Sequence, residues 1–297
     1  MRRAALCAAL LAVGLGAALL PPAAGGTTGS EAVYLGTYVW NERWDGFGGF
    51  SGLEMSADGL RFTALSDRVL LVSGRLSRDA SGLVNGVESG PPEPLLDTEG
   101  GLLRGARADS EGLAIGPDGT VWISFEGRAR VRRQNPDGSH PSLLPEDPEF
   151  DGLRPHASLE ALAVDAQGTL YTIPEQPPRG QRGSFPVYRF RGDAWDVPFR
   201  LPVRDGFAVT DADVGPDGRL YVLERDFTGL GFRSRLRRLN LDGSAEEILL
   251  TTATGTHDNL EGLDVWADAA GLRATMISDD NLYFFQETQF VDYRLPD

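Results

Sequence analysis

Carboxylates recur at one position of a repeated sequence pattern, which points to cation chemistry. Glu111, Glu160 and Glu261 each begin a short apolar segment, Glu-Gly-Leu or Glu-Ala-Leu, and Asp211 belongs to the corresponding pair Thr210-Asp211. Hard divalent cations, above all calcium, bind clusters of oxygen ligands of this kind. We therefore predict that Glu111, Glu160, Asp211 and Glu261 hold a divalent cation, with Ca²⁺ as the expected ion.

A second set of carboxylates closes the apolar segment that follows each member of the first set. Its members are Glu126, Glu175, Glu224 and Asp279. Carboxylates gathered in one place repel each other unless cations or arginines lie among them. We expect this set to act as bases or to support the metal ligands. The alternative is that carboxylates of both sets accept backbone N–H bonds and hold neighbouring elements together.

Cationic side chains stand four positions before three of these glutamates. Arg107 precedes Glu111, His156 precedes Glu160, and His257 precedes Glu261, while Arg225 directly follows Glu224. Histidine exchanges protons near neutral pH, and arginine presents a fork of donors that suits phosphate or carboxylate. These four residues are predicted to bind an anionic substrate. They could equally serve loop hydrogen bonds, or pair with adjacent acids.

The element that positions these side chains is a β-hairpin. Between Glu111 and Glu126, the apolar runs 113–115 and 121–125 flank Pro-Asp-Gly, a strong hairpin signal because glycine tolerates positive φ. The two ends of an antiparallel hairpin lie together, so Glu111 and Glu126 should be neighbours at the end away from the turn.

The same hairpin occurs five times. The turn glycines Gly59, Gly119, Gly168, Gly218 and Gly271 are 60, 49, 50 and 53 residues apart. A repeat of about 50 residues with short strands is typical of β-propeller blades. We predict an all-β chain forming a single five-bladed propeller, and the longer first interval leaves room for a sixth blade. Segment 32–38 should pair with the C-terminal strands, predicted at 282–285 and 290–295, and so close the ring.

Composition and charge limit the partners. The chain has 297 residues, 37 of them Gly and 19 Pro, and a net charge of −15. Such an acidic protein is not expected to bind nucleic acid or anionic membranes, because both carry negative charge. Residues 1–26 read as a signal peptide, with Arg2 and Arg3 followed by the apolar run 6–20, although an uncleaved anchor is the alternative. We expect an exported, periplasmic or extracellular, monomeric domain of residues 27–297 that contacts no membrane after cleavage.

Several motifs together resemble one family. They are Phe-Gly-Gly-Phe-Ser-Gly-Leu at 47–53, Ala-Leu-Ser-Asp at 64–67, Asp-Ser-Glu-Gly-Leu at 109–113, Leu-Glu-Ala-Leu at 159–162, Thr210-Asp211 with Leu-Glu-Arg at 223–225, and Asn-Leu-Glu-Gly-Leu at 259–263. The pattern resembles the phytase-like domain proteins, an esterase-like family of exported bacterial propellers. The resemblance implies hydrolysis of esters or phosphate esters, by analogy with calcium-dependent propeller phytases.

Three functions follow as hypotheses. The first is a secreted, divalent-metal-dependent hydrolase that acts on a small anionic ester. The second is a non-catalytic propeller that binds a ligand or a protein, favoured by the lack of a Gly-x-Ser-x-Gly nucleophile motif around Ser51. The third is a calcium-dependent lactonase-like enzyme.

Overall fold

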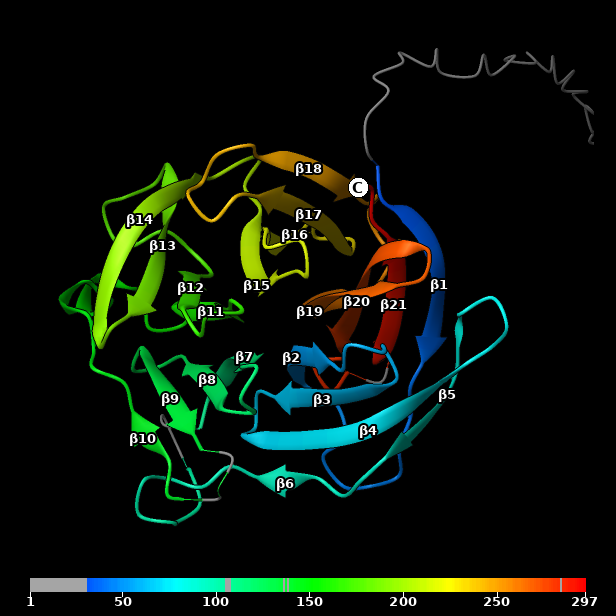
Figure 1. Ribbon diagram of the computed structural model, residues 1–297, viewed down its shortest axis with the longest axis horizontal. Coiled ribbons are helices and arrows are strands. Elements are labelled where there is room, and N and C mark those ends of the chain that lie inside the picture. Colours follow the sequence, from blue (N-terminus) through cyan, green and yellow to red (C-terminus); the bar gives the residue numbers. More distant parts are fainter. Residues whose placement is uncertain (1–30, 105–107, 136, 138, 284) are drawn as a thin grey trace, which may run out of the picture.

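The chain folds into five antiparallel sheets arranged in a ring around a central axis (Figure 1). The computed structural model describes residues 31–104, 108–135, 137, 139–283 and 285–297. One strand of each sheet lies innermost: β2 (Phe50–Met55), β7 (Ser110–Ile115), β11 (Leu159–Val164), β15 (Ala208–Val214) and β19 (Asn259–Asp268). The prediction of an all-β, five-bladed propeller is confirmed.

The first four blades follow the chain order outward from the axis. The first blade continues with β3 (Arg61–Ser66), β4 (Leu70–Arg78), β5 (Val84–Ser89) and β6 (Glu93–Pro94), and the second with β8 (Val121–Phe125), β9 (Arg130–Gln134) and β10 (Ser142–Leu143). The third blade continues with β12 (Leu170–Pro174), β13 (Ser184–Arg191) and β14 (Ala194–Pro202). The fourth continues with β16 (Leu220–Phe227), β17 (Phe232–Leu239) and β18 (Glu247–Thr251). A short 3-10 helix, η2 (Pro148–Gly152), precedes β11. The longer first interval holds β4, β5 and β6 rather than a sixth blade.

The last blade closes the ring with the N-terminal strand, as predicted. It contains β19, β20 (Gly271–Asp279), β21 (Gln289–Arg294) and β1 (Val33–Val39), and β1 pairs antiparallel with β21. The strand predicted at 282–285 is wrong. Asn281 and Leu282 have positive φ angles of 45° and 55°, which turn the chain at that point. Strand β1 takes the outer place in the blade.

The hydrophobic core lies between neighbouring sheets. Trp122 of β8 packs in one cluster with Leu162 and Tyr188 of the next blade, and Tyr221 of β16 packs with Leu263 of the last. Side chains of a strand alternate between its two faces, so each sheet can present apolar residues to both neighbours. Within the described part of the chain, no helix has the length and apolar character needed to cross a membrane.

Candidate metal and catalytic centre

A β-bulge marks the same position in all five inner strands. Pairing with the second strand skips one residue between Phe50 and Gly52, Leu159 and Ala161, Val209 and Asp211, and Leu260 and Gly262, and two residues between Ser110 and Leu113. The skipped residues include Ser51, Glu111, Glu160, Thr210 and Glu261. A bulge leaves its extra residue outside the regular ladder and redirects its side chain. The repeated carboxylate position is therefore also a repeated irregularity of the backbone.

The carboxylates of Glu111, Glu126 and Glu160 converge. One oxygen from each lies within 4.8 Å of the others, and all three residues are buried. Glu111 and Glu126 end the two strands of one hairpin, so their predicted proximity is confirmed, and Glu160 comes from the next blade. Three carboxylates at this separation form a donor set that suits a hard divalent cation.

Burial and mutual repulsion act on this group, which we call the carboxylate trio. Burial, and after it the charge of Glu261, raises the pKa of Glu111 well above its usual value. The pKa of Glu160 is raised in the same direction by burial and by the charge of Glu111. Among the described residues, no donor hydrogen-bonds either carboxylate. A bound cation would relieve both the repulsion and the lack of donors.

Glu126 differs from its two partners because it has a hydrogen bond. It accepts the backbone N–H of Ser158 at 2.9 Å, and burial raises its pKa to about 7 despite that bond. It also belongs to a second group, in which ligand atoms of Asp109, Glu126 and His156 lie within 4.8 Å of one another. The exposed side chain of His156 therefore lies beside Glu126, and its predicted role in binding an anion stays a prediction. Asp109 was missed, although it stands in the motif Asp-Ser-Glu, two residues before Glu111.

Arg225 connects two carboxylates outside the trio, Glu175 and Glu261. Its guanidinium donates to Glu261, to Asn259 Oδ1 at 2.9 Å and to Glu175 Oε1 at 3.1 Å. Asn259 Nδ2 in turn donates to Glu261 Oε1 at 2.8 Å. Arg225 thus pairs with Glu175 and Glu261 of other blades and not with its neighbour Glu224.

Asp279 lies at the same end of the propeller as the carboxylate trio, which we call the acidic rim. Burial, with the charge of Glu261 next in weight, raises its pKa to about 8, although it accepts the backbone N–H of Asn281 at 2.7 Å. The charges of Asp67 and Asp280 act in the same direction. The rim therefore remains acidic outside the carboxylate trio.

Asp211 does not join these carboxylates. It is 1% exposed, and its oxygens accept the backbone N–H groups of Ala212 and Leu263, each at 2.8 Å. The bulge places Thr210 at the position that Glu111 and Glu160 occupy in their blades. Asp211 thereby connects β15 to β19 of the next blade, and its carboxylate already has its hydrogen-bond partners.

Glu224 lies outside the centre as well. It is fully buried and forms ion pairs with Arg235 at 2.7 Å and Arg237 at 2.8 Å. Because successive side chains of a strand point to opposite faces, Glu224 and Arg225 cannot both face the rim. The prediction of a catalytic Glu224 is therefore not supported by its position.

His257 is also away from the trio. It is buried, and its Nε2 lies 2.6 Å from the hydroxyl of Tyr293 on β21. Its ring also contacts Tyr34 of β1, at 5.8 Å between centroids. His257 thus packs against the strands that close the ring. Arg107, the fourth predicted anion-binding residue, lies outside the described residues.

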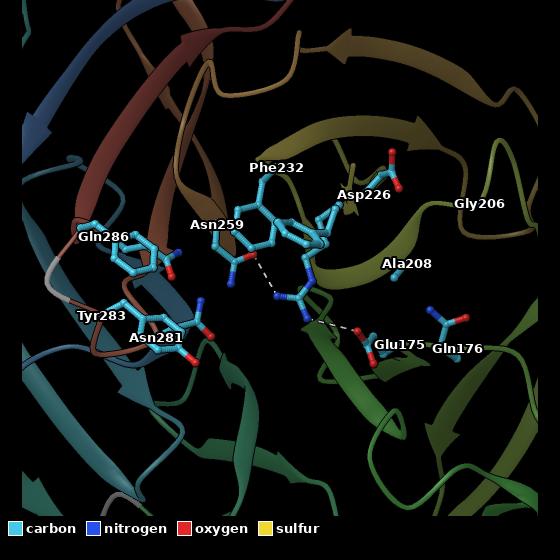
Figure 2. Close-up of a pocket in the computed structure, with 13 residues that line it drawn as sticks. Glu175, Gln176, Gly206, Ala208, Asp226, Phe232, Asn259, Asn281, Tyr283 and Gln286 are labelled. Carbon is cyan, nitrogen blue, oxygen red and sulfur yellow. Dashed lines mark hydrogen bonds and ion pairs between the residues drawn. The ribbon is translucent and has the colours of Figure 1, made fainter. Parts of the chain in front are cut away.

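A pocket of about 540 Å³ opens beside Arg225. Figure 2 shows Asn281, Tyr283 and Gln286 on one side of it, Glu175 and Gln176 on the other, and Phe232 and Asn259 between them. The aromatic residues of this pocket were not predicted as site residues. In the sequence Tyr283 belongs to a short apolar run, which predicts a strand and not a binding site.

Comparison with known proteins identifies the family. Residues 45–282 match the family described as "Phytase-like: Esterase-like activity of phytase". The match covers more than half of the chain, so this chain belongs to the phytase-like family. Among curated proteins, none matches the sequence.

Solved structures resemble the chain at low identity. A gluconolactonase from Xanthomonas campestris is 17% identical, covering 83% of this chain and 72% of its own, with a TM-score of 0.45. Virginiamycin B lyase from Staphylococcus aureus is 11% identical, with 82% of each chain covered and a TM-score of 0.44. The PQQ-bound aldose sugar dehydrogenase of Streptomyces coelicolor is 14% identical, covering 86% of this chain and 97% of its own, with a TM-score of 0.45. Similarity this distant does not indicate a shared activity.

Proposed function

We propose that this protein is an exported hydrolase of phosphate or other esters that requires a divalent cation, with Ca²⁺ as the expected ion. The observation that carries the proposal is the convergence of Glu111, Glu126 and Glu160 within 4.8 Å at one end of the propeller. Membership of the phytase-like family supports ester hydrolysis as the reaction. The leader pattern of residues 1–26 supports export.

Glu111 and Glu160 would hold the cation, and the charge of Glu261 acts on both of them. Both lack a hydrogen-bond donor among the described residues, and burial together with neighbouring carboxylates raises both pKa values. A bound divalent cation supplies positive charge that polarises an ester oxygen and makes water more acidic.

Glu126 would accept the proton from the attacking water. A general base works best when its pKa lies near the working pH, and that of Glu126 is raised to about 7. The amide of Ser158 fixes its carboxylate, and His156 lies beside it, where it can hold the proton or the anionic product. Arg225 would position Glu261 and Glu175 rather than bind an anion, because its guanidinium already donates to both.

The test is hydrolysis of four substrates by the purified protein: a phosphomonoester, a phosphodiester, a carboxylic ester and a sugar lactone, which is an internal ester. We expect at least one class to be hydrolysed with Ca²⁺, with activity lost in chelator and restored by Ca²⁺. Inactivity on all four would contradict the proposal. Retained calcium binding without activity would instead favour the non-catalytic propeller.

A further inference from the structure

One side of the acidic rim carries aromatic side chains. Phe227 ends β16 and Phe232 begins β17, and their ring centroids lie 5.1 Å apart. Tyr283 and Phe285 follow β20 and stack at 5.2 Å with an interplanar angle of 8°. Phe227, Tyr283 and Phe285 are 62%, 56% and 68% exposed. The rings of Phe227 and Tyr283 therefore contribute little to the core and offer exposed surface to a ligand.

The two aromatic pairs line the same pocket of about 540 Å³ (Figure 2). The pocket also contains Arg225, Glu175 and Asn259. Two residues that line the pocket, Glu175 and Arg225, act electrostatically on Glu126 and Glu160, so the aromatic pocket lies beside the carboxylate trio of the proposed centre. A molecule that reacts at the carboxylate trio could extend into it.

Charge limits what the pocket can hold. Arg225 is the cationic side chain that lines it, and its guanidinium already donates to Glu175, Asn259 and Glu261. The acids Glu175 and Asp226 line the same space. Further negative charge would meet repulsion from these acids, and no free cationic side chain lines the pocket among the residues that the structure describes. Flat uncharged groups, in contrast, can stack on phenyl and phenol rings.

The amides around the pocket complete this chemistry. Gln176, Asn259, Asn281 and Gln286 line it together with the aromatic residues. Ligand pockets commonly combine apolar surface with a few polar groups that fix orientation. Amide side chains can both donate and accept hydrogen bonds, so they suit a ring that carries neutral polar substituents.

We propose that the aromatic pocket is a specificity subsite that binds an uncharged planar ring of the substrate while the ester lies at the carboxylate trio. The substrate class is thus a ring-bearing ester and not a polyphosphorylated compound. This inference rests on the proposed hydrolase function. The residues that determine specificity are Phe227 and Tyr283, one from each aromatic pair.

The test compares the 2-naphthyl and ethyl esters of whichever acid the protein hydrolyses. Each variant is compared with the wild type on the same ester, so the intrinsic reactivity of the ester cancels. For Phe227→Ala and Tyr283→Ala, we expect kcat/KM to fall about tenfold on the naphthyl ester and to stay within about twofold on the ethyl ester. Ile248→Ala, an exposed apolar residue on β18 of the same blade, is the matched control and should change neither.

Binding of 2-naphthol to the chelated protein, measured by calorimetry, separates this inference from the proposed function. If no ester is hydrolysed but naphthol binds to the wild type and not to Phe227→Ala, the subsite stands and the hydrolase proposal fails. An equal loss on both esters, or no naphthol binding to the wild type, would overturn the subsite. So would concentration-dependent dimerisation that Phe227→Ala abolishes, because the pocket would then belong to a second copy of the chain.

Discussion

The two ends of the inner strands use the same side chains differently. At the bulge end, Glu111 and Glu160 have no hydrogen-bond donor among the described residues. Another set of carboxylates, Glu54, Asp213 and Asp264, lies three positions after the bulge in each strand, toward the hairpin turn. Each of them accepts a backbone N–H from the next blade. The donors are Ile115 for Glu54 at 2.9 Å, Val265 for Asp213 at 2.8 Å and Met55 for Asp264 at 2.9 Å.

Burial alone does not distinguish the two ends. It is the main cause of a raised pKa for Glu54, Asp213 and Asp264, as it is for Glu111 and Glu160. The difference lies in the partner. A carboxylate that accepts an amide of the next strand connects two blades, whereas Glu111 and Glu160, redirected by bulges, keep their oxygens available. We infer that the turn end is structural and that the bulge end binds the cation.

The largest expected effect is a loss of activity when a carboxylate at the bulge end is substituted. Glu111→Gln or Glu160→Gln keeps the size of the side chain but removes an anionic ligand. We expect hydrolysis to fall more than about 100-fold, beyond the loss typical of groups that only support metal ligands. Glu54→Gln is the matched control at the turn end and should keep activity within about threefold. Comparable losses in Glu54→Gln and Glu111→Gln, measured as kcat/KM on one ester, would remove the distinction between the ends.

The next effect concerns Glu224, which the sequence had placed among the catalytic residues. Glu224→Gln leaves Arg235 and Arg237 without their shared buried anion. Loss of one partner of a buried ion pair typically costs about 3–5 kcal/mol of unfolding free energy. Urea unfolding should show this loss, while the kcat of the folded protein stays within about twofold. A large drop in kcat with unchanged stability would return Glu224 to the active centre.

Calcium should stabilise the folded protein through the same trio. At a free concentration 100 times its Kd, a ligand that binds only the folded state adds about 2.7 kcal/mol. We expect the melting temperature to rise by about 5 °C with Ca²⁺ and to fall again in chelator. In Glu111→Gln, the chelated protein should melt higher than the chelated wild type, because one repelling charge is gone, and calcium should add little. A full calcium response in this variant would contradict the assignment.

The smallest expected effect concerns the turn end and is a change in how stability depends on pH. Burial raises the pKa of Asp213 from 3.8 to about 7, so between these values the folded state binds more protons than the unfolded state. Stability should therefore fall as the pH rises through this window. Asp213→Asn keeps an acceptor for Val265 N–H but cannot ionise. We expect a gain on the order of 1 kcal/mol at pH 8, and a smaller one at pH 5, by urea unfolding.

A turn aspartate provides the opposite-sign control for that measurement. Hydrogen bonds from Thr120 lower the pKa of Asp118, so its ionised form stabilises the fold. Asp118→Asn should therefore show no gain at pH 8. If both variants gained equally, the effect would reflect net charge and not the burial of Asp213.

The fold could be predicted from the sequence because its signals are local and repeated. Gly119, with φ of 81°, turns the hairpin that the Asp-Gly pair indicated. Five such turns at regular spacing define the blades, and the hairpin geometry brought Glu111 and Glu126 together. The pairing of β1 with β21 followed from the need to cover the edge of the last sheet.

The site was predicted only in part because small backbone details decide it. A one-residue bulge moved the repeat position from Asp211 to Thr210. The continuation of β16 through Phe227 placed Glu224 and Arg225 on opposite faces of the strand. Tyr283 and Phe285 follow the turn at Asn281 and Leu282 and give the rim exposed aromatic rings, where the apolar run predicted a strand. None of these features has a signal in residue types alone.

The most direct test is the position of bound metal in a crystal of the protein grown with Ca²⁺ or soaked with Mn²⁺, located by anomalous diffraction. The account predicts an ion about 2.4 Å from carboxylate oxygens of Glu111 and Glu160. An ion found instead among Glu54, Asp213 and Asp264, or an empty trio at saturating metal, would contradict it.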